Sequence, residues 1–268
     1  MDLKKLRRNG IVMVVTAIVT INTIFTVVQA EETELEADII YEIQPIILSG
    51  RTDNYSGKDS QKYDDGSEYT GEYFEGKRSG TGSYVFSNED SYIGEWENDL
   101  MSGNGEYTFS DGAKLSGVFE KGELKDGFFT YSDANGEYKI EVVDFEYLEE
   151  ITATLANGDV YYGVYSNDTF SGDCKILYFS GDYYEGQVVD NNKEGTGTYT
   201  WENGAIYIGN WKNDMMNGEG IYYFSSMVYP HLEGTFVDNQ PSGVCEYFTD
   251  ENVSITTIWE NGVCVSQG

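Results

Sequence analysis

Apolar and polar positions alternate in short runs along most of this chain. From residue 92 onward, Tyr92, Gly94 and Trp96 are separated by polar or variable residues, and a second alternating run covers residues 105–109. A repeat of two residues is typical of a β-strand with one apolar face. This stretch therefore predicts two strands, each with its aromatic rings on one face.

The two-strand pattern returns at a fixed interval of 23 residues. Copies begin at Tyr69, Tyr92, Leu115, Tyr138, Tyr161, Tyr184 and Tyr207 and then, after a two-residue insert, at Leu232 and Ile255. Counting back from the first copy reaches Ile46, so we predict that the array covers residues 46–268. A fixed interval of this length indicates a repeat protein, in which each unit buries its apolar surface against its neighbours.

Pairs of turn-forming residues separate the predicted strands. Numbering each unit from 1 to 23, positions 7 and 8 hold Asn98-Asp99 in one copy and lead towards Gly103 at position 12. Positions 20 and 21 hold Asp111-Gly112 and Asn203-Gly204, which are strong hairpin signals. The predicted fold is all-β, an elongated single-layer antiparallel sheet of tandem 23-residue β-hairpins in which each strand pairs with the next.

Glycines at positions 3 and 14 lie on the same predicted face as the rings. A large ring needs an empty neighbouring site to lie flat on a sheet, and the unit at 138–160 supports this idea. It carries Ile140 and Ile151 at the two glycine positions, while Val142 and Ala153 replace rings. The side-chain volume lost at the ring positions is thus regained at the glycine positions beside them, as close packing requires.

Units 115–137 and 138–160 depart most from the repeat, so we expect irregular strand pairs over residues 115–160. We expect the second of them to be irregular and no break between domains to occur there. An alternative for Glu146–Glu150 is one helical turn, inserted between the strands.

The recurring pattern is Tyr-x-Gly-x-aromatic followed by Gly-x-Gly-x-Tyr. It is carried by Tyr69, Gly71, Tyr73, Gly80, Gly82 and Tyr84, and again by Tyr92, Gly94, Trp96, Gly103, Gly105 and Tyr107. This pattern resembles the MORN (membrane occupation and recognition nexus) repeat family over about residues 69–254. The resemblance implies an all-β hairpin array that acts as a scaffold and often self-associates, and the family's name refers to membrane attachment through acidic lipids.

Residues 1–30 have the pattern of a targeting segment. A basic start is followed by an apolar run from Ile11 to Val28 and by small residues before Glu31, which predicts a signal peptide. The alternative is an uncleaved N-terminal anchor, because the run approaches spanning length. Both export the array across a membrane, to be secreted or held at the cell surface. Residues 31–45 are acidic and predict a flexible linker.

The chain is strongly acidic, with 47 Asp and Glu against 16 Lys and Arg. Without residues 1–30, 46 acidic and 12 basic residues remain, a net charge of −34. Such a surface repels nucleic-acid phosphates and anionic lipids, so nucleic acid is excluded as a partner and acidic-lipid binding is disfavoured.

Residues that could carry chemistry are scarce. His231 is the only histidine, and its place in the insert predicts a turn rather than a catalytic arrangement. Cys174 and Cys245 occupy the same repeat position three units apart, too far to bond, whereas a bond between Cys245 and Cys264 stays open. We therefore predict no enzyme activity, no cofactor and no metal site.

The rings supply the candidate binding surface. A single-layer sheet has too little bulk to cover both faces, so we expect accessible rings at Tyr73, Trp96, Tyr165, Trp211 and Trp259. The first hypothesis is an exported, non-catalytic scaffold that binds protein, with a second copy as one partner and a homodimer as one outcome. The alternative is an array whose rings stack on cell-wall glycan.

Overall fold

The computed structural model describes residues 5–8, 11–14, 39–41, 43–44, 53–225 and 227–268. Most of the predicted targeting segment and acidic linker, and the beginning of the first repeat unit, lie outside the described residues. The described residues form strands and turns and no helix. This confirms the predicted all-β array of antiparallel hairpins. No described helix could cross a membrane.

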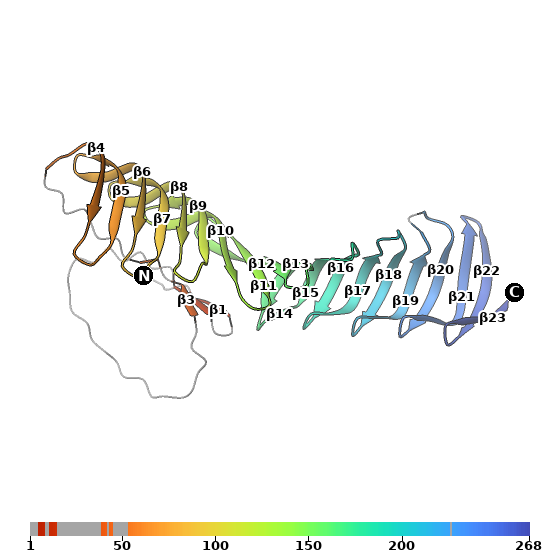
Figure 1. Ribbon diagram of the computed structural model, residues 1–268. Coiled ribbons are helices and arrows are strands. Elements are labelled where there is room, and N and C mark those ends of the chain that lie inside the picture. The colour runs from red at the N-terminus through yellow and green to blue at the C-terminus, as the bar shows by residue number, and fades with distance from the viewer. Residues whose placement is uncertain (1–4, 9–10, 15–38, 42, 45–52, 226) are drawn as a thin grey trace, which may run out of the picture. The chain divides into compact units, whose positions relative to one another are not determined.

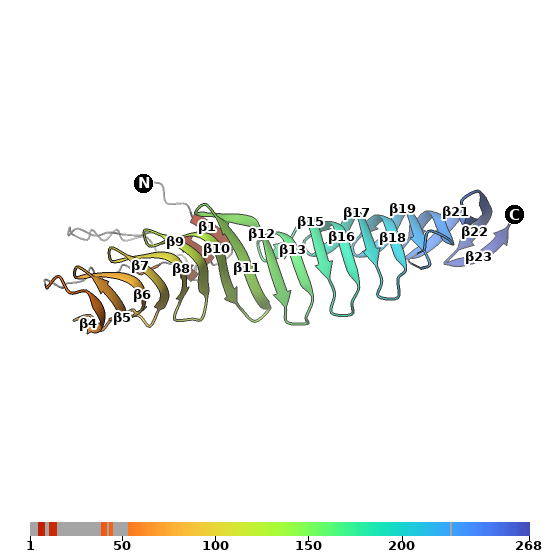
Figure 2. The ribbon, with the colours of Figure 1, turned by 90° about the horizontal axis from the view of Figure 1, so that it is seen from above.

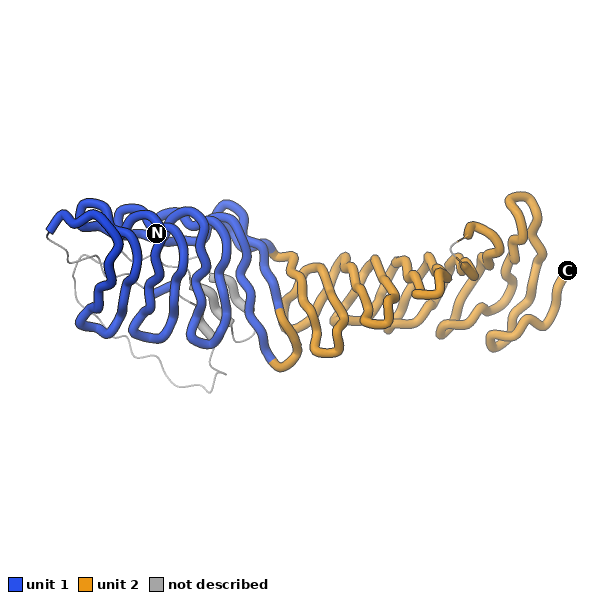
Figure 3. The backbone as a smooth tube through the Cα atoms, turned by 45° about the horizontal axis from the view of Figure 1, so that its top comes forward, with its two compact units in different colours: residues 1–133, 138–148 blue, residues 134–137, 149–268 orange. Residues whose placement is uncertain are grey.

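By its internal contacts the chain divides into two compact units, coloured separately in Figure 3. Unit 1 comprises residues 1–133 and 138–148, and unit 2 comprises residues 134–137 and 149–268. The division falls within the irregular region, where the repeat pattern alone suggested no break.

In unit 1, each strand from β4 to β10 pairs antiparallel with the next in chain order (Figure 1). These strands are β4 (Gly57–Lys62), β5 (Glu68–Phe74), β6 (Lys77–Val85), β7 (Ser91–Glu97), β8 (Leu100–Thr108), β9 (Lys114–Glu120) and β10 (Glu123–Ser132). A separate three-stranded sheet contains β1 (Lys5–Arg8), β2 (Ile11–Val14) and β3 (Ile39–Tyr41).

Unit 2 is also an antiparallel meander, and Figure 2 shows its strands from above. Its strands are β13 (Val160–Ser166), β14 (Thr169–Phe170), β15 (Gly172–Leu177), β16 (Tyr183–Val189), β17 (Asn192–Thr200), β18 (Ile206–Lys212), β19 (Met215–Tyr223), β20 (His231–Val237), β21 (Gln240–Asp250), β22 (Val253–Glu260) and β23 (Val263–Gln267). Because β13 pairs with both β14 and β15, one hairpin has an interrupted second strand.

The division between the units passes through β11 (Gly136–Val143) and β12 (Glu146–Leu155). The alternative of a helical turn at 146–150 is wrong, because these residues begin strand β12. Ile140, Val142, Ile151 and Ala153 are all buried, so the apolar face persists where the glycines are lost, as expected.

Two-residue turns close the hairpins. Asn98 and Asp99 have φ of 50° and 71°, and Asn213 and Asp214 have 47° and 66°. Two consecutive positive φ angles define the type I′ turn, whose twist matches that of the flanking strands, and Asn and Asp tolerate them well.

Longer turns join one hairpin to the next. At Asp111-Gly112 the Phe109 N–H donates to the Ala113 carbonyl at 2.8 Å, and the Gly112 N–H donates back to the Phe109 carbonyl at 2.9 Å. Position 18, expected in the second strand, therefore opens this turn.

A bulge interrupts most regular hairpins between positions 3 and 5. In β5 and β6, Gly71 pairs with Gly82 but Tyr73 pairs with Arg78, so the second strand carries extra residues. Gly80, at position 12, lies in this stretch with φ of 76°. The glycine at position 12 therefore serves the bulge and not the turn. A bulge bends its strand and increases the local twist.

Candidate functional site

The tyrosine at position 1 lies over the paired glycines of its own hairpin. A Cβ atom on Gly71 or Gly82 would collide with the ring of Tyr69, whose hydroxyl donates to the Glu72 carbonyl at 2.9 Å. The same arrangement recurs at Tyr92, Tyr184 and Tyr207. This confirms that missing side chains create the room for the rings.

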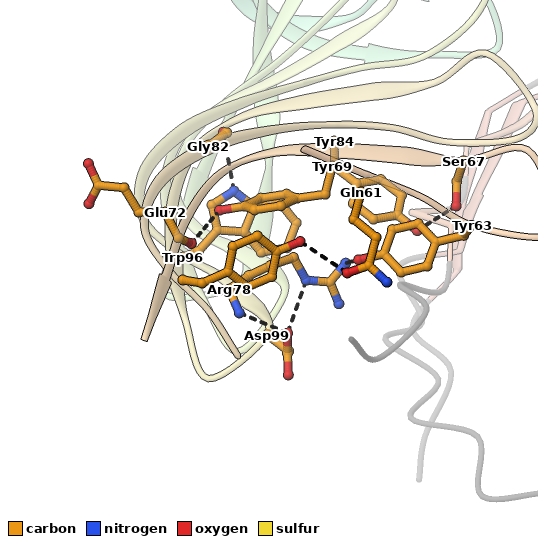
Figure 4. Close-up of polar contacts among 11 residues, drawn as sticks. Gln61, Tyr63, Ser67, Tyr69, Glu72, Arg78, Gly82, Tyr84, Trp96 and Asp99 are labelled. Atoms are coloured by element: carbon orange, nitrogen blue, oxygen red, sulfur yellow. Dashed lines mark hydrogen bonds and ion pairs between the residues drawn. The ribbon is translucent and has the colours of Figure 1, made fainter. Parts of the chain in front are cut away.

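Position 10 fills a cage of aromatic rings, as Figure 4 shows for Arg78. The Arg78 side chain is 0% exposed. Its guanidinium carbon lies 5.1–5.8 Å from four ring centroids, those of Tyr63, Tyr69, Tyr84 and Trp96. Cation–π attraction to several rings partly offsets the loss of hydration of this buried charge.

Unit 2 contains an equivalent cage around Lys193. Its ammonium group lies 5.4–5.7 Å from the rings of Tyr178, Tyr184, Tyr199 and Trp211. It also pairs with Asp214 at 2.9 Å and donates to the Tyr178 hydroxyl at 3.0 Å. In four other units the same position holds a buried apolar residue, namely Met101, Leu124, Phe170 and Met216. The cage therefore accepts either a paired cation or an apolar side chain.

Three of the five candidate rings are buried, so the expectation of accessibility is wrong for Tyr73, Trp96 and Trp211. The Trp96 ring lies 5.2 Å from that of Tyr69, and its indole N–H donates to the Gly82 carbonyl at 3.2 Å. The physical reason is packing between units, because the Trp96 ring lies against the position 1 rings of its own and the preceding unit and against the Arg78 side chain. Tyr165 and Trp259 are half-buried.

Rings at positions 16 and 18 form a row that crosses successive hairpins. In unit 1 this row, which we call ladder 1, consists of Tyr84, Phe86, Tyr107 and Phe109, with neighbouring centroids 4.6, 5.3 and 4.9 Å apart. In unit 2 the equivalent positions form ladder 2. Its members are Tyr199, Trp201, Tyr222 and Phe224, with centroids 4.7, 5.4 and 5.1 Å apart. The two ladders share sequence position and spacing.

The ladders differ in exposure. All four rings of ladder 1 are 7% exposed or less. In ladder 2 three rings are half-buried and Phe224 is 47% exposed. Ladder 2 is therefore a contiguous aromatic surface that the rest of the described chain leaves partly open.

A segment from outside the repeats contacts ladder 1 at Tyr107. The Gln44 N–H donates to the Tyr107 hydroxyl at 3.1 Å, and the side chain of Ile43 is 5% exposed. The Tyr107 hydroxyl in turn donates to Asp90 at 2.6 Å. Sequence reasoning assigned residues 43–44 to a linker. The apolar run around them was the signal that could have indicated docking.

An aspartate at position 22 anchors a ladder tyrosine of the next hairpin in two places, at Asp90 and at Asp182. Asp182 accepts from the Tyr199 hydroxyl at 2.7 Å and from the Glu202 N–H at 2.8 Å. Partial burial alone would raise the pKa of Asp182, but these hydrogen bonds outweigh it and hold the pKa below its usual value. Burial also raises the pKa of Tyr199, so its hydroxyl remains a proton donor.

The described residues offer binding surfaces rather than reactive groups. All three cysteines are free, so Cys245 and Cys264 are not bonded. Burial raises the pKa of Cys174 to about 11, which suppresses its thiolate. His231 is buried at the start of β20 and not in a turn. Among described residues no group of three or more potential ligands could hold a metal ion.

Comparison with known proteins identifies the repeat. The sequence model of the MORN repeat matches residues 69–91, 92–114, 184–206, 207–226 and 233–253. No curated protein matches the chain. One similar solved structure is the TCP domain of SAS-4 (dCPAP) from Drosophila melanogaster in complex with a proline-rich motif of Ana2 (dSTIL). It is 11% identical, covers 67% of this chain and 90% of its own, and has a TM-score of 0.37.

The five matched segments include the hairpins that carry both ring ladders and both cation cages. The four most regular copies have the tyrosine over its glycine pair, as the repeat pattern requires. This chain is therefore a member of the MORN repeat family.

Proposed function

We propose that the chain is a non-catalytic repeat scaffold that binds another protein through ladder 2. MORN repeats generally mediate protein–protein or membrane interactions, and proteins built from them are typically scaffolds. The observation that carries the proposal is the exposure of Tyr199, Trp201, Tyr222 and Phe224, in contrast to their covered counterparts in unit 1. A contiguous accessible aromatic patch is typical of an interaction site.

Charge narrows the class of partner. Unit 2 contains 19 Asp and Glu against three lysines, a net charge of −16. Such a field repels phosphate backbones and anionic lipid surfaces and favours partners that are neutral or basic around their contact site. A protein partner fits this charge, whereas nucleic acid and an acidic membrane do not.

We propose that the array is exported across a membrane and is then either secreted or held at the cell surface. The support is the basic start and apolar run of residues 1–30 in the sequence. Self-association is one form of the proposed function, in which the partner is a second copy. Light scattering on the purified chain measures it directly.

Cell-wall glycan is the alternative ligand. Trp201 favours it, because a half-exposed indole is a surface on which a sugar ring can stack. Against it, both neighbours of Trp201 along the ladder pack within 5.4 Å, which leaves little free ring face.

Sedimentation with envelope material from the producing cells tests the proposal. The full-length chain is mixed with intact envelopes and with envelopes from which protein has been removed. The ladder variant is Phe224→Ser, and the matched control is Ile208→Ser, on the opposite face of the same repeat and 45% exposed. We expect retention on intact envelopes only, reduced by the ladder variant but not by the control.

If the wild type is also retained on protein-free envelopes and the ladder variant is not, the ligand of ladder 2 is glycan and not protein. Equal retention of wild type and both variants on intact envelopes would contradict ladder 2 as the binding surface.

A further inference from the structure

We propose that ladder 2 binds an extended peptide segment in the way that ladder 1 holds Ile43 and Gln44. In this arrangement the Tyr222 hydroxyl takes the place of the Tyr107 hydroxyl and bonds to a backbone N–H of the partner. The inference rests on the proposed function, because it names the form of the protein that ladder 2 recognises.

The contact in unit 1 shows what such a ladder can hold. Ile43 is buried, and the next residue donates its backbone N–H to the Tyr107 hydroxyl at 3.1 Å. The contact therefore includes a main-chain hydrogen bond next to a buried apolar side chain. The bond is independent of the side chain at position 44, so the feature recognised is an apolar residue followed by any residue that has a free N–H.

The receiving surfaces match in position and spacing. Tyr107 and Tyr222 both occupy position 16 and are each flanked by rings at position 18 of their own and the preceding unit. The two ring distances at Tyr107 are 5.3 and 4.9 Å, and those at Tyr222 are 5.4 and 5.1 Å. A segment that fits against ladder 1 therefore meets the same ring spacing on ladder 2.

The Tyr222 hydroxyl is more available than that of Tyr107. The Tyr107 hydroxyl donates to Asp90, whereas Ala205 occupies the corresponding position before Tyr222. Among the described residues nothing hydrogen-bonds to the Tyr222 hydroxyl, and partial burial alone raises its pKa. This hydroxyl can accept from a peptide N–H and donate to a peptide carbonyl at the same time.

An extended conformation follows from the hydrogen bond. Inside a helix each backbone N–H is already bonded to a carbonyl four residues earlier, so it has no proton to give to a tyrosine. An extended segment keeps its N–H groups free for a partner. Proline at the donating residue would remove the bond altogether.

The test uses a peptide of residues 37–47 of this chain, labelled with a fluorophore, as the probe. Its anisotropy is followed as the full-length protein is added. We expect saturable binding, and about fivefold weaker binding of a matched peptide that is N-methylated at the residue equivalent to Gln44, because one hydrogen bond is lost. In a control, unlabelled peptide should displace the labelled one, which would show that the peptide and not the fluorophore binds the protein.

Three protein variants locate the site. Tyr222→Phe keeps the ring and removes the hydroxyl, so we expect about fivefold weaker binding of the unmodified peptide and no effect on the methylated one. Tyr162→Phe removes the hydroxyl of a tyrosine that is 43% exposed and lies outside the ladder, and it is the matched control. Phe224→Ser should weaken both peptides by about tenfold. Unfolding midpoints in urea show that each variant is folded.

The inference is overturned if the two peptides bind equally, if Tyr222→Phe changes nothing, or if no binding occurs up to about millimolar protein. A fourth variant, Tyr107→Phe, tests ladder 1 in the same way. The inference is also overturned if this is the only variant that weakens binding, because the peptide would then displace the chain's own segment from ladder 1. Failure here with a positive envelope result for Phe224→Ser would leave the proposed function standing and remove only the extended-peptide mode.

Discussion

Arg78 and Asp99 lie in adjacent hairpins, and each donates a hydrogen bond to the other and accepts one from it. The Asp99 N–H donates to the Arg78 carbonyl at 3.1 Å, while the backbone N–H and the Nε of Arg78 donate to one Asp99 carboxylate oxygen at 3.0 and 3.1 Å. The turn of one hairpin is thus clamped to position 10 of the hairpin before it. The same two bonds, one to a backbone carbonyl and one to an Asp or Asn side-chain oxygen, join Phe170 to Asn191, Lys193 to Asp214 and Met216 to Asn239.

The buried charge at Arg78 should be dispensable for stability. The pair Met216 and Asn239 shows that an apolar residue and a neutral amide form the same clamp. We expect Arg78→Met with Asp99→Asn to change the free energy of unfolding by less than about 1 kcal/mol or to raise it, as for other buried ion pairs replaced by apolar residues.

Removing one partner alone should do much more harm. Asp99→Ala leaves the Arg78 charge buried among rings, and we expect a loss of about 3 kcal/mol or more in urea unfolding. A double variant as unstable as Asp99→Ala would show that the cation itself is needed in the cage.

The paired glycines should tolerate no side chain beneath a tyrosine. Gly82→Ala places a methyl group against the ring of Tyr69, and we expect destabilisation by about 1–3 kcal/mol in urea unfolding. Adding Tyr69→Leu should recover part of this loss, because Leu232 with Cys245 already combines a smaller first residue with a side chain at position 14. No recovery would mean that the glycine is required by the backbone.

Acid should weaken the anchor at Asp182. Its pKa is lowered in the folded chain, so the charged form contributes stability above the unfolded pKa, and this contribution is lost as pH falls through the folded pKa. We expect Asp182→Asn to unfold at a urea midpoint that falls less between pH 7 and pH 3 than that of the wild type. Asp173→Asn, at an exposed position of β15, is the control, and equal pH dependence of all three proteins would refute the anchor.

The three thiols should differ in reactivity. Burial raises the pKa of Cys174 to about 11 and also raises that of Cys245, whereas Cys264 lies half-exposed on β23. We expect a thiol reagent at pH 8 to label one cysteine quickly and two only on unfolding, with the fast site lost in Cys264→Ser. Rapid labelling of all three would show that the hairpins around the other two open readily.

The fold could be predicted from the sequence because its signals are local. Turn pairs such as Asn98-Asp99 fix the hairpins, and the 23-residue interval fixes which rings and glycines meet. The burial of Tyr73 and Trp96 could not be predicted in this way, since it depends on which rings and position 10 side chains of neighbouring hairpins pack against them. The role of Gly80 was missed because the bulge appears only in the register of the paired strands.

The candidate site depended on long-range contacts that no repeat pattern encodes. Gln44 and Tyr107 are 63 residues apart in sequence, and no repeat pattern predicts that a segment from outside the repeats contacts ladder 1 there. Tyr107 and Tyr222 occupy equivalent positions in the sequence. The structure shows that Asp90 accepts a hydrogen bond from the Tyr107 hydroxyl, and only then does the replacement of this aspartate by Ala205 before Tyr222 become informative.

The clamp between neighbouring hairpins has a consequence for how such a chain can change length. In the four clamped pairs the turn binds the hairpin before it through a backbone N–H and through an Asp or Asn side chain at the same repeat position. Excising or duplicating a 23-residue block therefore rejoins compatible surfaces, while a cut of any other length would leave a turn facing the wrong residue. Evolution or an engineer could shorten or extend the ribbon in whole steps without redesigning its interior.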